Sequence, residues 1–375
     1  FMIEIKKNYD LTKLNTFGIS AWAKFFVELN DEKDLEELFL SPEFKNNQKL
    51  FLGGGSNILF TKNFDGIVIL NKLKGIEILE VPTKVPTRVG TQVGKNFVFI
   101  RAMGGEIWHD LVTFAVNKDY WGIENLSFIP GTVGAAPIQN IGAYGAELKD
   151  ILENVEAYEI KTGQKKIFKN KECEFGYRDS IFKNKFKGEY FIVAVVLKLS
   201  KMEKKNINYK ILREYLEKPA RNAFSIADAG GNKIVEYTPK IISDAVMAIR
   251  KSKLPDPVLI GNAGSFFKNV FVDKEKLQDL LQKYPNVPYF EEENGSKENG
   301  SKASVLVKIS AAWLIEKCGW KGRRIGNVGV HEKQALVLVN YGGATGGEIK
   351  NLSEQIIASV RSKFGLKLER EVNLI

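Results

Sequence analysis

The sequence has few of the residues that most often carry hydrolytic or metal chemistry. Its 375 residues include two cysteines, Cys173 and Cys318, and two histidines, His109 and His331. The cysteines lie far apart and form no CxxC pair, so the sequence indicates neither a disulfide framework nor a thiolate metal site. It also contains no HExxH motif, histidine cluster or GxSxG motif. We therefore expect no metal, and we look for chemistry in other side chains or in a cofactor.

Long apolar runs are absent as well. No run approaches the roughly 18 residues of a membrane-spanning helix, and the first residues, FMIEIKKNYD, lack the apolar core of a signal peptide. We therefore expect a cytoplasmic protein, and we take it to be a monomer. The net charge is +10, but the lysines are scattered among acidic residues. This favours small anionic ligands such as nucleotides and carboxylates, with nucleic acid as an alternative.

Length and a hydrophobic content of 44% predict two or three domains. Strand-length apolar runs with one helix between residues 23 and 71 indicate a small α+β unit. A second unit combines an amphipathic helix within residues 104–122, a glycine-rich segment, and strands at 155–160 and 190–199.

The last third is rich in helix signals. Residues 345–365 predict a helix with a capping box formed by Thr345 and Glu348 and a closing Gly365. The alternating run LKLEREVNLI, residues 366–375, predicts a strand whose pattern leaves Glu369 and Glu371 exposed.

Two glycine-rich segments are candidates for binding. LGGGSN, residues 52–57, follows a strand, and its backbone N–H groups can form an anion-binding nest or simply a strand turn. IPGTVGAAPIQNIGAYGAEL, residues 129–148, suits a backbone pressed against a flat or extended ligand, or tight packing between strands. Together they suggest a large phosphorylated cofactor.

Two further stretches carry polar groups of interest. FGYRDSIFK sets Arg178 among aromatic residues, where a guanidinium grips a carboxylate or phosphate or forms a buried ion pair with Asp179 or a neighbour. GNAGSFFKN sets Ser265 where no histidine or acid is near in the sequence. Ser265 is therefore not expected to be a triad nucleophile.

Taken together, seven motifs resemble the UDP-N-acetylenolpyruvoylglucosamine reductase family, flavoenzymes that complete UDP-N-acetylmuramic acid for bacterial peptidoglycan. They occur in the family's order and span nearly the whole chain: LNTFGI, LGGGSN, GIENLSFIPGTVGAAPIQNIGAYGAEL, FGYRDSIFK, KLPDP, GNAGSFFKN and LEREV. The resemblance implies an α+β protein, with a two-subdomain FAD-binding fold of the vanillyl-alcohol-oxidase type and a C-terminal α+β substrate-binding domain.

The implied division of the chain has four parts. Residues 1–70 form FAD-binding subdomain 1, and 71–243 form subdomain 2 with a connector and a substrate-covering tyrosine loop. Residues 244–365 form the substrate-binding domain, and 366–375 form a strand that returns to the active site.

The resemblance also implies FAD as cofactor, NADPH as reductant and UDP-N-acetylglucosamine enolpyruvate as substrate. NADPH reduces FAD, flavin N5 gives a hydride to the terminal enolpyruvyl carbon, and Ser265 protonates the resulting enolate. Arg178 and Glu371 are the other catalytic residues.

The implied contacts fall on two further sets of residues. The FAD contacts are Gly53, Gly54, Gly55, Ser56, Asn57, Ile129, Pro130, Gly131, Gly134, Ala135, Gln139, Asn140, Gly142, Ala143, Tyr144 and Gly145. The substrate contacts are Tyr177, Tyr209, Lys253, Asn269, Lys321 and Gln334.

The chain departs from the family pattern in places. Val270 stands where a proline is common, Asn373 where an arginine is common, and residues 81–103 and 210–243 are divergent. Two rival hypotheses remain. One is an oxidase on the same FAD fold that acts on an alcohol or sugar without NADPH. The other is a basic nucleic-acid-binding protein without flavin.

Overall fold

The computed structural model describes residues 3–79, 96–218, 224–227, 233–291 and 306–375. The duplicated segment ENGSKENGSK and parts of the two divergent segments lie outside these ranges. The chain divides into two compact units. Unit 1 comprises residues 1–9, 23–55 and 65–252, and unit 2 comprises residues 10–22, 56–64 and 253–375. Among the described helices, none has the length and hydropathy needed to span a bilayer.

In the part that the structure describes, unit 1 contains two larger sheets, two smaller sheets of two strands each, and several helices. Its α-helices are α1 (Asp34–Leu40), α2 (Pro42–Asn46), α3 (Trp108–Val116), α4 (Lys210–Leu216) and α5 (Pro239–Lys253), the last of which ends in unit 2. Its 3-10 helices are η2 (Glu124–Leu126), η3 (Val133–Gln139), η4 (Leu148–Asp150) and η5 (Asn170–Cys173).

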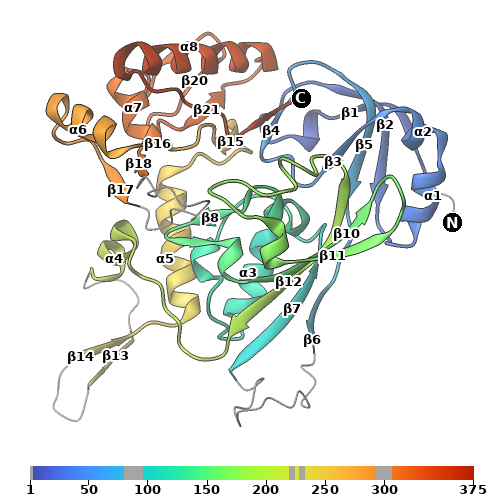
Figure 1. Ribbon diagram of the computed structural model, residues 1–375, viewed down its shortest axis with the longest axis horizontal. Coiled ribbons are helices and arrows are strands. Elements are labelled where there is room, and N and C mark those ends of the chain that lie inside the picture. The colour runs from blue at the N-terminus through green and yellow to red at the C-terminus, as the bar shows by residue number, and fades with distance from the viewer. Residues whose placement is uncertain (1–2, 80–95, 219–223, 228–232, 292–305) are drawn as a thin grey trace, which may run out of the picture. The chain divides into compact units, whose positions relative to one another are not determined.

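The strands of unit 1 are β1 (Lys6–Asp10), β2 (Trp22–Leu29), β3 (Gln48–Leu52), β5 (Phe64–Asn71), β6 (Ile76–Leu79), β7 (Phe97–Met103), β8 (Gly142–Ala143), β9 (Ala146–Glu147), β10 (Leu152–Glu159), β11 (Lys165–Lys169), β12 (Tyr190–Ser200), β13 (Phe224–Ala227) and β14 (Lys233–Glu236), a few of whose end residues fall in unit 2. One sheet has the order β1-β2-β5-β3, in which β3 and β5 run parallel. The other is a five-stranded antiparallel sheet of order β11-β10-β12-β7-β6 (Figure 1). The two-stranded sheets are β8-β9 and β13-β14.

Strand β12 is the structural centre of unit 1. Its sequence YFIVAVVLKLS is almost continuously apolar, and nearly all of it is buried. Such a run is typical of a strand covered on both faces. It accordingly contributes to two separate hydrophobic clusters, one with Trp108 and one with α1 and α2.

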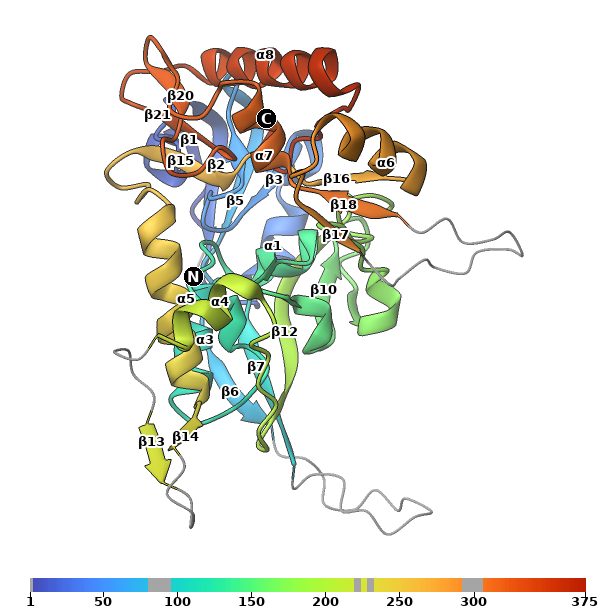
Figure 2. The same ribbon diagram turned by 90° about the vertical axis from the view of Figure 1, so that its left-hand side faces the viewer.

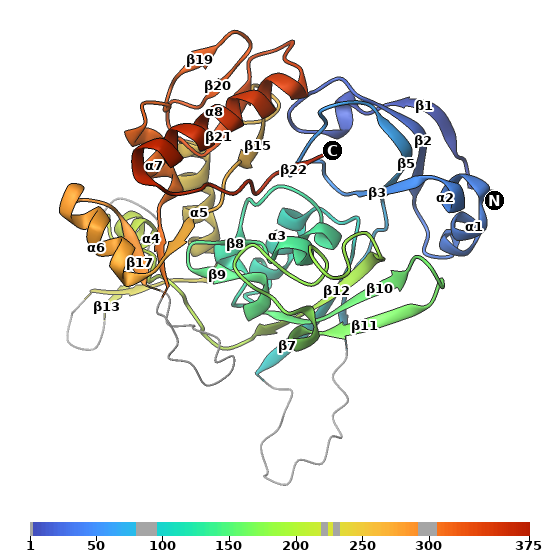
Figure 3. The same ribbon diagram turned by 45° about the horizontal axis from the view of Figure 1, so that its top comes forward.

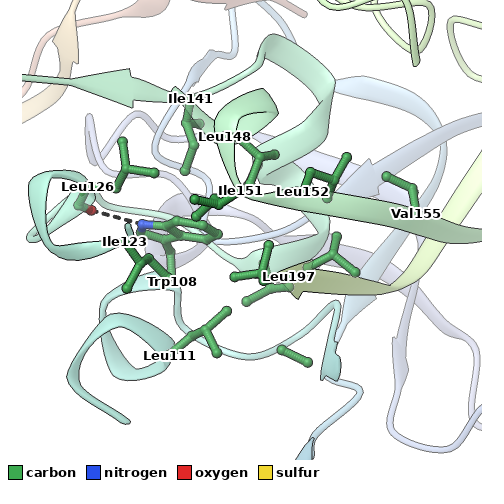
Figure 4. Packing of buried hydrophobic residues seen from close by; sticks show 14 of the residues in the cluster. Trp108, Leu111, Ile123, Leu126, Ile141, Leu148, Ile151, Leu152, Val155 and Leu197 are labelled. Atoms are coloured by element: carbon green, nitrogen blue, oxygen red, sulfur yellow. Dashed lines mark hydrogen bonds between the residues drawn. The ribbon is translucent and has the colours of Figure 1, made fainter. Parts of the chain in front are cut away.

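The larger cluster surrounds Trp108, the first residue of α3 (Figure 4). The indole is buried, and its Nε1–H donates to Leu126 O at 2.9 Å. The surrounding side chains shown are Leu111, Ile123, Leu126, Ile141, Leu148, Ile151, Leu152, Val155 and Leu197. The predicted amphipathic helix is therefore confirmed, and it anchors the glycine-rich segment that follows it.

A smaller cluster joins α4 and α5 (Figure 2). Its buried members are Trp121, Leu212, Leu216, Ile242, Ala245, Val246 and Ile249. Sequence patterning predicts a lysine-rich connector with helical pieces over residues 201–243, which includes α4 and only the start of α5. The two helices are stabilised because their apolar residues pack with Trp121 in this one cluster.

Within its described residues, unit 2 has three α-helices and several short strands (Figure 3). Its helices are η1 (Thr12–Leu14), α6 (Lys274–Lys283), α7 (Ala311–Lys317) and α8 (Gly346–Phe364). Its strands are β4 (Ile58–Leu59), β15 (Gly261–Ser265), β16 (Val270–Val272), β17 (Tyr289–Glu291), β18 (Val307–Ile309), β19 (Arg324–Ile325), β20 (Val328–Val330), β21 (Val337–Asn340) and β22 (Asn373–Leu374). They form sheets β15-β21-β20-β19 and β16-β18-β17 and the parallel pair β22-β4.

Helix α8 has the predicted boundaries. Thr345 and Glu348 form a reciprocal capping box, and Gly365 ends the helix at φ +67°. Its predicted apolar stripe, which includes Ile349 and Ile356, is buried.

The predicted strand over residues 366–375 is only partly correct. The buried alternation of Leu366, Leu368 and Val372 holds, but ladder pairing is limited to β22 and a single bridge between Phe267 and Arg370. The segment contacts two short partners in succession, first the residues after Ser265 and then β4, so no continuous strand forms.

A network of charged side chains links the strands of unit 1. Glu156 on β10 accepts two hydrogen bonds from Arg101 on β7, at 2.7 and 2.9 Å, and pairs with Lys165 at 3.0 Å. The Arg101 hydrogen bond lowers the pKa of Glu156, while burial opposes this and Lys165 adds to it. Bidentate pairing of this kind is the strong form of the interaction.

We predict that Glu156→Gln lowers the free energy of unfolding by about 3 kcal/mol at pH 7, because two cations lose a shared buried partner. Urea denaturation measures this. The matched control is Glu77→Gln, whose carboxylate is 57% exposed and contacts the same guanidinium at 3.1 Å; its loss should stay below about 1 kcal/mol.

The same pair tests the pH dependence. The pKa of Glu156 is lowered on folding, so its contribution is complete above the ordinary value of 4.5. It is lost as the pH falls from there through the lower pKa of the folded state. Equal losses in both variants, or a Glu156→Gln effect that does not shrink in acid, would contradict this account.

Candidate active site

The two glycine-rich segments contact each other in unit 1. A Cβ on Gly54, just after β3, would lie 2.9 Å from Gly131 Cα, and one on Gly53 would lie 2.3 Å from Thr132 Oγ1. Both distances are shorter than real Cβ contacts allow, so glycine is required for the approach. The structure therefore brings together two segments that are far apart in the sequence.

This contact contains an unsatisfied hydrogen-bonding group. Thr132 Oγ1 is buried and has no hydrogen-bond partner within the described ranges. A hydroxyl beside two glycine backbones suits the oxygens of a phosphate group, and a buried hydroxyl without a partner costs stability. The residues therefore fit the pyrophosphate of FAD.

The second glycine-rich segment is more ordered than a loop. Residues 133–139 form η3, which packs on the end of β7, with Gly134 N–H donating to Gly104 O at 2.8 Å. A Cβ on Gly134 would lie 3.1 Å from Gly104 Cα. Tight packing, one of the two interpretations of this segment, thus accounts for Gly134.

Asn140 ends η3 and joins it to the turn that carries Arg178. It is fully buried at φ +45°, and its Nδ2 donates to Glu147 Oε2 and to Gly176 O, each at 3.0 Å. Ser180 Oγ donates to Ile138 O at 2.8 Å on the other side of the turn. The turn is therefore fixed to the glycine-rich segment at both ends.

Arg178 itself is half-buried in a strained conformation. Its φ is +54°, which is rare for a residue with a side chain. Its Nη2–H donates to Gly142 O at 2.6 Å, and its guanidinium lies 5.3 Å from the Tyr177 ring centroid. A Cβ on Gly142 would lie 2.9 Å from Arg178 Nη1, so this glycine makes room for the guanidinium.

Two tyrosines and a second arginine lie nearby. The rings of Tyr144 and Tyr209 meet edge to face with centroids 5.4 Å apart, and burial raises the pKa of both phenols. Burial lowers the pKa of Arg250 on α5; Tyr144 opposes this shift and the charge of Arg178 adds to it. Arg250 therefore lies within electrostatic range of Tyr144 and Arg178, and positive charge at this position favours an anionic ligand.

Phe128, which immediately precedes the second segment, is held by two hydrogen bonds. Its φ is +59°; its N–H donates to His109 Nδ1 at 3.1 Å, and its carbonyl accepts from Arg250 Nε at 3.1 Å. Burial lowers the pKa of His109, which favours the neutral ring that can accept this bond. These contacts fix the backbone directly before the predicted cofactor residues Ile129 and Pro130.

Unit 2 positions Ser265 at an irregularity in β15. The register shifts between Asn262 and Ser265, and Gly264 has φ +66° with its N–H bonded to Asn262 Oδ1 at 2.9 Å. Such bulges redirect a side chain. Ser265 Oγ is half-buried, and no hydrogen bond links it to any residue of the described ranges.

Three motifs meet beside Ser265. Phe266 O accepts from Glu371 N–H at 2.8 Å, and Phe266 N–H donates to Leu336 O at 2.8 Å. Asn57 Nδ2, at the end of LGGGSN, contacts Glu371 O at 3.4 Å. Glu371 is half-buried, which corrects the exposed position that alternation alone predicts.

The other predicted residues have these positions. Gly55 falls in unit 1 and Ser56 in unit 2, and Tyr144 and Gly145 form the turn between β8 and β9. Ala135 and Gln139 lie in η3, and Ala143 in β8.

Three of the remaining substrate-contact candidates bond to other residues of the chain, and the fourth lies at the end of a helix. Lys253 ends α5, and Asn269 Oδ1 accepts from Ala311 N–H at 3.0 Å. Lys321 pairs with Glu316 at 3.1 Å, and Gln334 Oε1 accepts from Leu336 N–H at 3.4 Å.

Sequence reasoning missed Thr132, His109 and Arg250. Arg250 lies three residues before Lys253, so the two share a side of α5. The sequence around Arg250 is rich in lysine and gives no signal that Arg250 is half-buried. His109 has no neighbour in the sequence that reveals its bond to Phe128.

Comparison with known proteins identifies two domains in the chain. Residues 23–169 match the model of an FAD binding domain. Residues 256–375 match the model of the UDP-N-acetylenolpyruvoylglucosamine reductase C-terminal domain. The crystal structure of UDP-N-acetylenolpyruvylglucosamine reductase from Thermus caldophilus has a TM-score of 0.58 at 21% identity and covers 99% of this chain and 98% of its own. The expected fold class is confirmed, and the protein is an FAD-containing oxidoreductase.

Similarity to curated proteins covers the full length. The chain is 43% identical over 373 residues to UDP-N-acetylenolpyruvoylglucosamine reductase of Flavobacterium johnsoniae and 45% identical over 373 residues to that of Amoebophilus asiaticus, each covering 100% of both chains. The enzyme of Bdellovibrio bacteriovorus is 40% identical over 98% of this chain and 99% of its own. The chain belongs to the UDP-N-acetylenolpyruvoylglucosamine reductase family.

We predict that Gly54→Ala raises the Kd for FAD about tenfold or more. The added methyl group forces the two glycine-rich backbones apart, and overpacking costs about 1–3 kcal/mol, where 1.4 kcal/mol is a factor of ten. Flavin fluorescence titration of the apoprotein measures it. Gly347→Ala is the control, because its Cβ meets nothing closer than 3.8 Å. An unchanged Kd in Gly54→Ala would contradict an FAD site at the contact between the two glycine-rich segments.

Proposed function

We propose that this chain reduces UDP-N-acetylglucosamine enolpyruvate to UDP-N-acetylmuramate with NADPH, a step of peptidoglycan synthesis. Full-length similarity to the curated reductases supports this reaction. The observation that carries it is the hydrogen bond between Glu371 N–H and Phe266 O. It joins the segments that hold two of the three predicted catalytic residues, Ser265 and Glu371.

FAD, when bound, supplies the hydride that it receives from NADPH. The residues that would hold it are the predicted cofactor set around Gly53, Gly54 and Gly131, to which we add Thr132. The close backbone contact and the unpartnered hydroxyl support this assignment. The protein thereby supplies orientation and exclusion of water.

The substrate's alkene is conjugated to a carboxylate, so hydride addition at the terminal carbon pushes negative charge toward that carboxylate. A group that meets this charge lowers the barrier if it binds the transition state more tightly than the ground state. We assign this role to Arg178, whose guanidinium is held by Gly142 O and Tyr177. Arg250 adds a second positive charge beside it.

The enolate-like intermediate then needs a proton on the carbon that bears the ether oxygen. We assign the donor role to Ser265, which gives a proton and therefore needs no histidine to remove one. Its hydroxyl has no hydrogen-bond partner among the residues described, which leaves the O–H available. Glu371 is proposed to orient or share protons with its partners.

The substrate contacts remain predictions: Tyr177, Tyr209, Lys253, Asn269, Lys321 and Gln334. Lys253 and Lys321 are proposed to pair with the diphosphate, and for Lys321 this requires exchange of its ion pair with Glu316. The four-part domain division, the monomeric state, the cytoplasmic location and the lack of a nucleic-acid partner also remain predictions.

The function is tested by an anaerobic absorbance record of the purified protein. NADPH should bleach the flavin band, and UDP-N-acetylglucosamine enolpyruvate should restore it promptly. Recovery only with oxygen would support the oxidase hypothesis. A protein that neither contains nor takes up flavin would overturn the proposal.

We predict that Ser265→Ala leaves flavin reduction by NADPH nearly intact and slows reoxidation by the substrate by about 10²–10⁴, the usual contribution of a general acid. Stopped-flow absorbance separates the two half-reactions. Ser359→Ala is the control, since this half-buried serine on α8 bonds only to Gln355 O within its own helix. Equal slowing of both half-reactions would remove Ser265 from the proton-donor role.

A further inference from the structure

Asn125 bridges two separate segments of unit 1. It lies in η2 and is 1% exposed, and its Nδ2 donates to Tyr144 O and to Asn206 O, each at 2.8 Å. Tyr144 belongs to the β8–β9 turn of the glycine-rich segment, while Asn206 belongs to the chain that leads into α4. The buried Asn125 amide thus donates a hydrogen bond to one backbone carbonyl in each of the two segments.

Two further contacts join the same segments. Asn206 Nδ2 donates to Gly145 O at 2.9 Å, and the rings of Tyr144 and Tyr209 meet edge to face at 5.4 Å. Tyr209 follows Asn206 by three residues and stands at the N-cap of α4. Asn125, Asn206 and the two rings therefore fix Tyr209 against the turn.

Residues 201–209 depend on such contacts because they form no helix or strand. Ile207 packs against the α4–α5 cluster, and Lys201 and Met202 are hydrogen-bonded at the start of the segment, but the polar anchors next to Tyr209 are those of Asn125 and Asn206. Asn125 Oδ1 is buried with no partner inside the described ranges. The unpartnered Oδ1 destabilises the fold, so the contribution of this side chain comes from the two hydrogen bonds that its Nδ2 donates.

We propose that Asn125 is a positioning residue that fixes Tyr209 against the glycine-rich cofactor segment and thereby shapes the substrate site. The substrate part rests on the proposed function, in which Tyr209 contacts the UDP-linked substrate. Because Tyr144 and Gly145 are cofactor-segment residues, ordering of that segment by FAD also orders residues 201–209. The two binding events are thus coupled through Asn125.

Trypsin provides a test that does not depend on activity. Lys204 and Lys205 are exposed and lie two residues and one residue before Asn206. In the FAD-loaded protein, Asn125→Ala should raise the cleavage rate at these lysines about tenfold or more, because two buried carbonyls lose their donor. Mass spectrometry of the released peptides measures it, and wild-type apoprotein should be cleaved faster than the loaded protein.

Asn170→Ala is the matched control. Asn170 Nδ2 also bridges two carbonyls, Lys149 O and Leu152 O, each at 2.7 Å, in the same unit. This variant should leave cleavage at Lys204 and Lys205 unchanged. If Asn125→Ala does not fold, Asn125→Leu keeps the shape while removing the donor without adding a charge, and it should show the same acceleration.

Steady-state kinetics test the substrate part. Asn125→Ala should raise the KM for UDP-N-acetylglucosamine enolpyruvate about tenfold, while the rate of flavin reduction by NADPH changes less than about twofold. Cleavage equal to that of Asn170→Ala would overturn the proposal. Faster cleavage with an unchanged KM would overturn its substrate part. If wild type fails to reduce the substrate, the proposed function fails, and the cleavage comparison still decides whether Asn125 fixes Tyr209.

Discussion

The direct contact between the backbones of Gly53–Gly54 and Gly131–Thr132 is the constraint on which unit 1 depends. Glycine permits the approach but cannot hold it, because it has no side chain to pack and loses much entropy on ordering. The surrounding structure therefore supplies the rigidity. Trp108 anchors the segment to the core through Leu126, and η3 packs on the end of β7 in the five-stranded sheet. A sequence that looks flexible is thus part of a rigid scaffold.

Strain at the site is held in place by paired polar contacts. Phe128, Asn140, Tyr144 and Arg178 all have positive φ, a conformation that side chains disfavour. Each is held by specific bonds. His109 and Arg250 bond to Phe128, and Asn125 donates to the Tyr144 carbonyl. Asn140 donates to Glu147 and Gly176, and Arg178 donates to the Gly142 carbonyl. Groups fixed in this way do not need to reorganise when charge develops on a ligand, which is the physical basis of preorganised catalysis.

Local patterns made α8, α3 and the strands predictable, because caps and apolar periods act within one element. Family motifs also indicated which residues matter. What the sequence could not indicate is long-range pairing. Alternation made Glu371 look exposed, whereas the bond to Phe266 half-buries it. Arg250 and Asn125 carry no local signal, since their partners Phe128, Tyr144 and Asn206 come together only in the folded unit.

Unit 2 is assembled from segments that lie far apart in the sequence, and this has a consequence for its folding during synthesis. Its β4 pairs with β22, and Thr61 N–H donates to Ile375 O at 2.8 Å across most of the chain. On the ribosome, residues 10–22 and 56–64 emerge long before the segments that they pair with, while unit 1 has all its residues by Ser252. Non-local pairing of this kind is slow to form. Unit 2 therefore completes only after synthesis of the last strand, and the early β4 segment must remain unpaired and protected from aggregation until then.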